Sequence, residues 1–160
     1  MIYNNITDLK RDLQPESRFL ALDVGTKVIG MAICDPSRTI CNPFGTISRL
    51  GNKKDFLKIQ EYIKQNEIEL LVIGLPIHIN GSESKISIFV RRFATNIDVF
   101  LLGKIKILLY DERYSSSSAR IFIDDNLKLT KKHNRKKTID KIAANIILET
   151  FILDFNKSVI

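Results

Sequence analysis

The sequence predicts an α/β protein built on a mixed five-stranded sheet, with three antiparallel strands followed by parallel strands and helices on both faces. Two observations lead to this fold class. Between residues 18 and 47, three short apolar runs are joined by tight turns, as expected for antiparallel strands. After residue 50, helical and strand-like apolar patterns alternate. Such alternation is typical of parallel strands joined by helical crossovers.

The first three strands are expected to form an antiparallel meander. The first run ends at Asp23 and is followed by a turn that contains Gly25. The third run contains Pro43, which is typical of an irregular or edge strand because proline cannot donate a hydrogen bond to a neighbouring strand. The three runs comprise residues 19–22, 28–33 and 39–47.

Helices and strands then alternate to the end of the chain. Strands are expected at residues 69–75 and 105–110, and helices around 56–63 and 86–97. A shorter helix is expected from the serine run 115–118. The last helix is predicted to bury one stripe made of Ile139, Ile142, Ala143, Ile146, Ile147, Thr150 and Phe151.

The chain of 160 residues suits a single domain. Residues 1–16 have loose helical spacing and end near Pro15, so they are treated as an N-terminal extension to a domain at 17–156. No apolar stretch is long enough to cross a bilayer, and the first residues lack the apolar region of a secretory signal. A cytoplasmic protein is therefore expected.

The net charge of +7 favours a polyanionic partner such as nucleic acid. Six basic residues lie within the segment Lys128–Lys137, which is expected to be a solvated loop that contacts phosphates or merely aids solubility. The two cysteines and two histidines show no metal-binding spacing, so a zinc site is not expected. The sequence also offers few residues for nucleophilic catalysis by a histidine base. Carboxylates remain as the candidate catalytic groups.

Acidic residues stand at three points that the predicted sheet could bring together. Asp23 ends the first strand, Asp111 and Glu112 end the last strand, and Asp140 lies at the start of the last helix. Clustered carboxylates are the ligands that hard divalent ions prefer, and two such ions can drive phosphodiester hydrolysis. Taken singly, each residue could equally be a turn residue, a solvated strand end, or an acid near a helix start capped by Thr138. The pattern does not choose between Asp111 and Glu112.

Four stretches in order resemble the YqgF family of RNase H-like proteins, described as pre-16S ribosomal RNA nucleases and also as Holliday junction resolvase-like. They are LALDVGTKVIGMAICDP, VIGLPIHINGSES, YDER and IDKIAANIIL. The resemblance covers about residues 18 to 155. It departs at Val28, where family members often carry a basic residue, and after Arg113, where leucine is usual. These departures bear on substrate affinity.

The resemblance implies that Asp23, Glu112 and Asp140 are the catalytic residues and the ligands of magnesium or manganese. It selects Glu112 over Asp111. The residues expected to border the site are Gly25, Thr26, Pro76, Gly81 and Ser82. The residues expected to contact nucleic acid are Lys27, Arg113, Lys131, Lys132, Arg135, Lys136 and Lys137.

The expected function is therefore a metal-dependent endonuclease that trims the 5′ end of precursor 16S ribosomal RNA. A resolvase that cuts four-way DNA junctions is the first alternative, and it would act as a symmetric dimer. A non-catalytic RNA-binding assembly factor is the second. An actin-like ATPase, which also opens with Asp-x-Gly-Thr, would need a second domain that this chain has no room for. The sequence does not decide between a monomer and a dimer.

Overall fold

The computed structural model describes residues 1–112 and 135–158, with the side chains of the last helix described from Ile139 onward. The strands are β1 (Ile2–Tyr3), β2 (Arg18–Val24), β3 (Val28–Cys34), β4 (Cys41–Ser48), β5 (Ile68–Leu75) and β6 (Lys106–Asp111). The helices are α1 (Ile6–Asp12), α2 (Asn52–Gln65), α3 (Lys85–Phe100) and α5 (Arg135–Lys157). The helix predicted from the serine run 115–118 lies outside the described residues.

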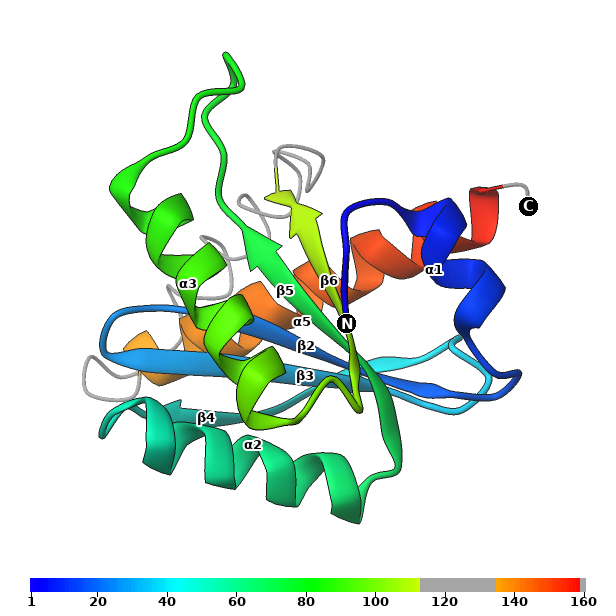
Figure 1. Ribbon diagram of the computed structural model, residues 1–160, viewed down its shortest axis with the longest axis horizontal. Helices are drawn as coiled ribbons and strands as arrows, with labels where there is room; N and C mark the ends of the chain where they lie inside the picture. The colour runs from blue at the N-terminus through cyan, green and yellow to red at the C-terminus, as the bar shows by residue number, and fades with distance from the viewer. Residues whose placement is uncertain (113–134, 159–160) are drawn as a thin grey trace.

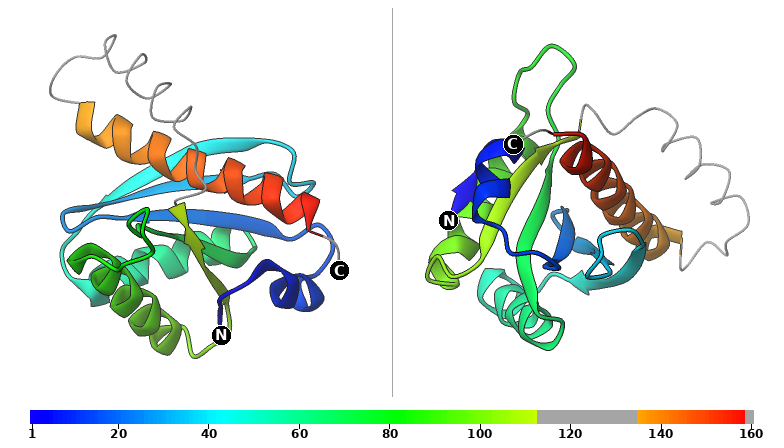
Figure 2. Two further views of the ribbon diagram at one scale, coloured as in Figure 1. Left: turned by 90° about the horizontal axis from the view of Figure 1, so that it is seen from above. Right: turned by 90° about the vertical axis from the view of Figure 1, so that its right-hand side faces the viewer.

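The strands form one mixed sheet in the order β1-β6-β5-β2-β3-β4. The pairs β2–β3 and β3–β4 are antiparallel, whereas the pairs β2–β5, β5–β6 and β6–β1 are parallel. Helices α2 and α3 cover one face of the sheet and α5 covers the other, as the three views show (Figures 1 and 2). The predicted fold class, with an antiparallel meander followed by parallel strands, is therefore confirmed.

The sheet has a sixth strand that the sequence did not predict. Ile2 and Tyr3 pair in parallel with Ile107 and Leu108 at the outer edge of β6. A strand of two residues is too short to show alternation, and its partner lies about a hundred positions away. Helix α1 follows, and its Leu9 is fully buried in the core beneath α5. The N-terminal segment thus packs against the sheet through both β1 and α1.

Alternate residues of each strand point to the two faces, as the pleat requires. In β2, Leu20 and Leu22 join the core under α2 and α3. Phe19 and Ala21 join the core under α5. Asp23 has the same parity as Phe19 and Ala21, so its carboxyl group belongs to the α5 face.

Helix α5 differs from its prediction in two respects. It begins at Arg135, so Thr138 is an internal helical residue rather than an N-cap and Asp140 lies in the second turn. Its buried stripe consists of Ala144, Ile147, Leu148, Phe151, Ile152 and Phe155. The predicted Ile142, Ala143 and Ile146 are only partly buried. Apolar residues occur on several sides of this helix, so periodicity alone could not identify the face that packs on the sheet. No helix in the described ranges is long and apolar enough to span a membrane.

Candidate active site

Asp23 stands between two glycines at the end of β2. It pairs directly with Gly30 on the antiparallel strand β3. On its other side, Leu22 pairs with Ile73 of β5, so continuing the parallel register places Gly74 beside Asp23. Both neighbours lack a side chain on the α5 face. This leaves room above the sheet on each side of the Asp23 carboxylate.

The space above Gly74 is filled by the side chain of Glu112. A Cβ atom placed on Gly74 would overlap Glu112 Oε1 and Ile147 Cδ1 of α5. The Glu112 carboxylate therefore lies over the strand next to Asp23, and neighbouring strands are about 4.8 Å apart. Asp111 instead pairs with Leu75, which is buried under α2 and α3. The backbone therefore presents Glu112, and not Asp111, on the face that carries Asp23.

The space above Gly30 is filled by the main chain of α5 at Asp140. A Cβ atom on Gly30 would overlap the Asp140 carbonyl group. The second turn of α5 therefore rests on β3 beside Asp23. Burial raises the pKa of Asp23 from 3.8 to about 6, and the negative charge of Asp140 contributes to the same rise. The negative charges of the two carboxylates thus repel each other.

The three carboxylates supply the oxygen ligands that magnesium and manganese prefer. A cation would also relieve the repulsion that raises the pKa of Asp23. Within residues 1–112 and 135–158, however, no three side chains of His, Cys, Asp or Glu lie close enough to hold one ion together. Glu112 lies over the strand on one side of Asp23, and the backbone of Asp140 lies over the strand on the other side.

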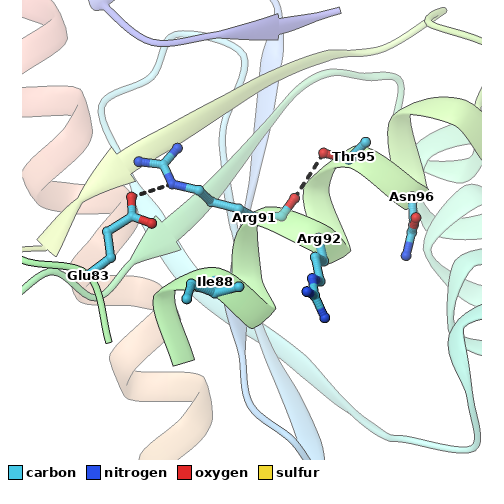
Figure 3. Close-up of a pocket in the computed structure, with 6 residues that line it drawn as sticks. All are labelled: Glu83, Ile88, Arg91, Arg92, Thr95 and Asn96. Atoms are coloured by element: carbon cyan, nitrogen blue, oxygen red, sulfur yellow. Dashed lines mark hydrogen bonds and ion pairs between the residues drawn. The ribbon is translucent and has the colours of Figure 1, made fainter. Parts of the chain in front are cut away.

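The loop at residues 76–84 leaves β5 at the same edge of the sheet, and its own hydrogen bonds hold it. His78 N donates to Ser82 O at 3.1 Å, and Gly81 N donates to His78 O at 2.8 Å. Gly81 has a φ of 83°, a conformation that favours glycine. At the base of the loop, Glu83 pairs with Arg91 of α3 at 2.5 Å (Figure 3). The predicted bordering residues Gly81 and Ser82 therefore lie in an ordered turn.

A groove of about 340 Å³ lies on the exposed side of α3 (Figure 3). Its lining residues are Glu83, Ile88, Arg91, Arg92, Thr95 and Asn96. None of the predicted carboxylates contributes to it. The candidate active site is therefore the sheet edge around Asp23, and not this groove.

The predicted nucleic-acid contacts are distributed over three places. Lys27 is exposed in the β2–β3 turn, two residues beyond Gly25. Arg135, Lys136 and Lys137 form the first turn of α5 rather than part of a loop. The remaining predicted contacts, Arg113, Lys131 and Lys132, lie outside the described residues.

Sequence reasoning missed two residues that shape the site. Gly30 was not singled out, although an isolated glycine within a strand often marks a close approach of other backbone or side chains. Arg49, whose side chain holds the β2–β3 turn, gave no signal because its partners are distant in sequence.

Comparison with known proteins bears on what this site does. A sequence model of the family described as "RuvX: Holliday junction resolvase" matches residues 17–154. A protein of Sulfurihydrogenibium sp. named "Putative pre-16S rRNA nuclease" is 38% identical over 85% of this chain and 90% of its own length. A Thermoanaerobacter pseudethanolicus protein of the same name is 36% identical over 84% of this chain and 95% of its own length. A Rickettsia bellii protein of that name is 32% identical over 98% of this chain and 99% of its own, so that match extends into the N-terminal segment.

Among solved structures, this chain resembles RuvC of Thermus thermophilus. A structure described as RuvC in complex with Holliday junction substrate has a TM-score of 0.56 and 7% identity, covering 86% of this chain and 96% of the other. A second T. thermophilus RuvC structure has a TM-score of 0.52 and 9% identity over the same shares. These similarities establish the RuvC-like, RNase H-like fold that the sequence predicted.

Proposed function

The chain belongs to the RuvX family, and from this membership we propose that it is a divalent-metal-dependent endonuclease that hydrolyses phosphodiester bonds. We propose the 5′ end of precursor 16S ribosomal RNA as its substrate. The names of relatives that are 32–38% identical over most of the chain support this choice. The two free cysteines suit a reducing compartment, and we place the activity in the cytoplasm.

The observation that carries the proposal is the placement of three carboxylates around one strand end. Asp23 lies between two glycines, with the Glu112 side chain over one and the Asp140 backbone over the other. An acid with a pKa raised to about 6 by burial and a neighbouring charge is costly to keep ionised at neutral pH. Such a cost is typical of functional sites rather than of structural ones.

In this mechanism Asp23, Glu112 and Asp140 would hold the metal. Divalent metal supplies charge neutralisation on the phosphate and an activated water when it is bound. Asp23 can bind a cation only after it has lost its proton, so the affinity of the metal-free protein for the cation should rise with pH through about 6. Exposed Lys27 in the adjacent turn provides a positive charge for a neighbouring phosphate of the substrate.

Cleavage of four-way DNA junctions is the second candidate, and the family description favours it. Such a reaction needs two symmetric cuts, so it requires a dimer in solution. A monomeric protein that cleaves precursor RNA alone would exclude this alternative.

The test is cleavage of precursor 16S ribosomal RNA and of a synthetic four-way junction, each with magnesium, manganese or a chelator. The substitutions Asp23→Asn, Glu112→Gln and Asp140→Asn should each lower cleavage by at least a hundredfold. Asp111→Asn is the matched control, because Asp111 pairs with Leu75 of the opposite core and should retain cleavage within a few fold.

Three outcomes would contradict the proposal. Cleavage that persists in the chelator would remove the metal from the mechanism. Full activity of Glu112→Gln together with loss in Asp111→Asn would show that the opposite face of β6 carries the chemistry. A wild-type protein that binds RNA without cutting either substrate would support a non-catalytic assembly factor.

A further inference from the structure

The Arg49 side chain is an almost buried cation at the junction of β4 and α2. Only 9% of it is exposed, and its Nε atom lies 3.0 Å from Oδ2 of Asp55, a side chain that is 1% exposed. The other oxygen of Asp55 accepts a hydrogen bond from Leu50 N at 3.0 Å. The carboxylate is therefore shared between the arginine and the backbone at the start of α2.

The same arginine holds the turn between β2 and β3 from two sides. Its backbone N donates to the carbonyl oxygen of Lys27 at 2.9 Å. Its Nη1 atom donates to the carbonyl oxygen of Gly25 at 3.3 Å. These two bonds bracket Thr26, the exposed residue at the centre of the turn. Asp23 lies only two residues before this bracket.

Further contacts fix the plane of the guanidinium group. Nη2 donates to Oδ1 of Asn52 at 2.6 Å. The rings of Phe89 and Phe93 on α3 lie 5.1 Å and 5.3 Å from its central carbon. Every nitrogen of the guanidinium therefore has a partner, and two aromatic rings prevent it from turning. Because these phenylalanines belong to the α2–α3 face, Arg49 acts from the side of the sheet opposite the carboxylates.

A buried ion pair contributes little net stability, since an apolar pair of similar size often replaces it without loss. Its use lies in the geometry that it imposes. Here the ion pair fixes the main chain of Gly25 and Lys27 in the turn, and Lys27 is an exposed residue four positions after Asp23.

We propose that Arg49 is a positioning residue for substrate binding. By holding the carbonyl groups on both sides of Thr26, it keeps the Lys27 ammonium in place to contact a phosphate next to the cleaved bond. The inference rests on the proposed function, because it takes the phosphodiester backbone of that substrate as the ligand of Lys27.

The test is a double-mutant cycle on RNA affinity with the substitutions Arg49→Lys and Lys27→Gln. Arg49→Lys preserves the charge opposite Asp55 but loses the fork that reaches Gly25 and Asn52. Dissociation constants for precursor ribosomal RNA are measured in an Asp23→Asn background, where the substrate is not cut. Lys27→Gln should weaken binding several fold and reduce the slope of log affinity against log salt by about 0.7–0.9, as loss of one phosphate contact requires.

If Arg49 acts through Lys27, Arg49→Lys should also weaken binding several fold, and the double variant should bind no more weakly than the weaker single variant. In cleavage-competent protein, the same change should raise KM and leave kcat within about twofold. A purely structural role would not give this split.

Ile63→Ala is the control for a general loss of stability, since Ile63 is buried in α2 away from the turn. It should unfold at a lower temperature and bind RNA as the wild type does. If Arg49→Lys does not fold, Asn52→Ala removes one guanidinium contact without leaving a buried charge unpaired, and should give a smaller effect of the same sign.

Wild-type affinity in Arg49→Lys, or effects of the two substitutions that simply multiply, would overturn the proposal. Because the cycle reads binding alone, it remains informative if the wild type cuts neither substrate and only the proposed reaction fails. Absence of any RNA affinity in the wild type would overturn both.

Discussion

Replacing Asp23 with asparagine should stabilise the metal-free protein at neutral pH while it abolishes cleavage. Burial, with a further contribution from Asp140, raises the pKa of Asp23 from 3.8 to about 6. Each pKa unit corresponds to about 1.4 kcal/mol, so ionised Asp23 costs the folded state up to about 3 kcal/mol. Because the carboxylate is partly exposed and its surroundings can relax, we expect Asp23→Asn to recover about 1–2 kcal/mol.

The raised pKa of Asp23 determines how the stability gain depends on pH. The folded protein takes up a proton at Asp23 near pH 6, whereas the unfolded chain does so near 3.8. Between these values the folded state binds more protons, so this group makes the protein more stable as the pH falls. The stability gained by Asp23→Asn should therefore be full above about pH 7 and vanish below about pH 4.

Urea unfolding and thermal melting at pH 4.0, 5.5 and 7.5 in a chelator measure this difference. At pH 7.5 the variant should melt about 2–8 °C above the wild type, since 1 kcal/mol shifts Tm by about 2–4 °C in a domain of this size. Glu16→Gln, which changes an exposed acid, should show no such pH-dependent gain. Magnesium should stabilise the wild type and have little effect on Asp23→Asn. A less stable variant, or a gain that is the same at every pH, would refute the reasoning.

Two further predictions concern packing. Gly30→Ala should destabilise the protein by about 1–3 kcal/mol and lower cleavage, because its Cβ would displace the α5 backbone at Asp140. Gly45→Ala is the control, because a Cβ atom has more room there. Equal loss of stability of the two variants in urea unfolding would contradict the close approach of α5 to Gly30. Leu9→Ala should lower the free energy of unfolding by about 2–5 kcal/mol, because Leu9 is fully buried between α1 and the sheet. Leu57→Ala, at a half-exposed position, should lower it far less. Similar melting temperatures of the two variants would show that the N-terminal segment does not support the fold.

The sequence predicted the long, regular parts of the fold correctly, because their patterns are local. The apolar run that ends at Asp23 is a strand, and the helical spacing around residues 86–97 is helix α3. The failures occurred where the local pattern carries no information. Strand β1 has two residues and depends on a partner about a hundred positions away, and α5 starts within a basic segment that resembles a loop.

The three acidic residues were selected from the motifs, but the two glycines beside Asp23 explain what lies around it only in the structure. Gly30 and Gly74 stand inside strands, where a glycine has no side chain to pack and weakens the sheet. The role of these glycines becomes clear only from the position of β2 between β3 and β5. The two glycines then leave room on both sides of Asp23, for the backbone of α5 and for the side chain of Glu112.

The choice between Asp111 and Glu112 shows why neighbouring acids cannot be ranked from a strand that is buried on both faces. Alternation would reveal the inward face, but β6 carries apolar residues at nearly every position, so no period of two is visible. The structure shows which face each residue of β6 occupies, because Tyr110 pairs with Gly74 and packs under α5. Residues of the same parity face α5, and a register slip by one residue would bring Asp111 to Asp23 in place of Glu112. Which of the two acids lies on the face of Asp23 is therefore set by the pairing of β6 with β5.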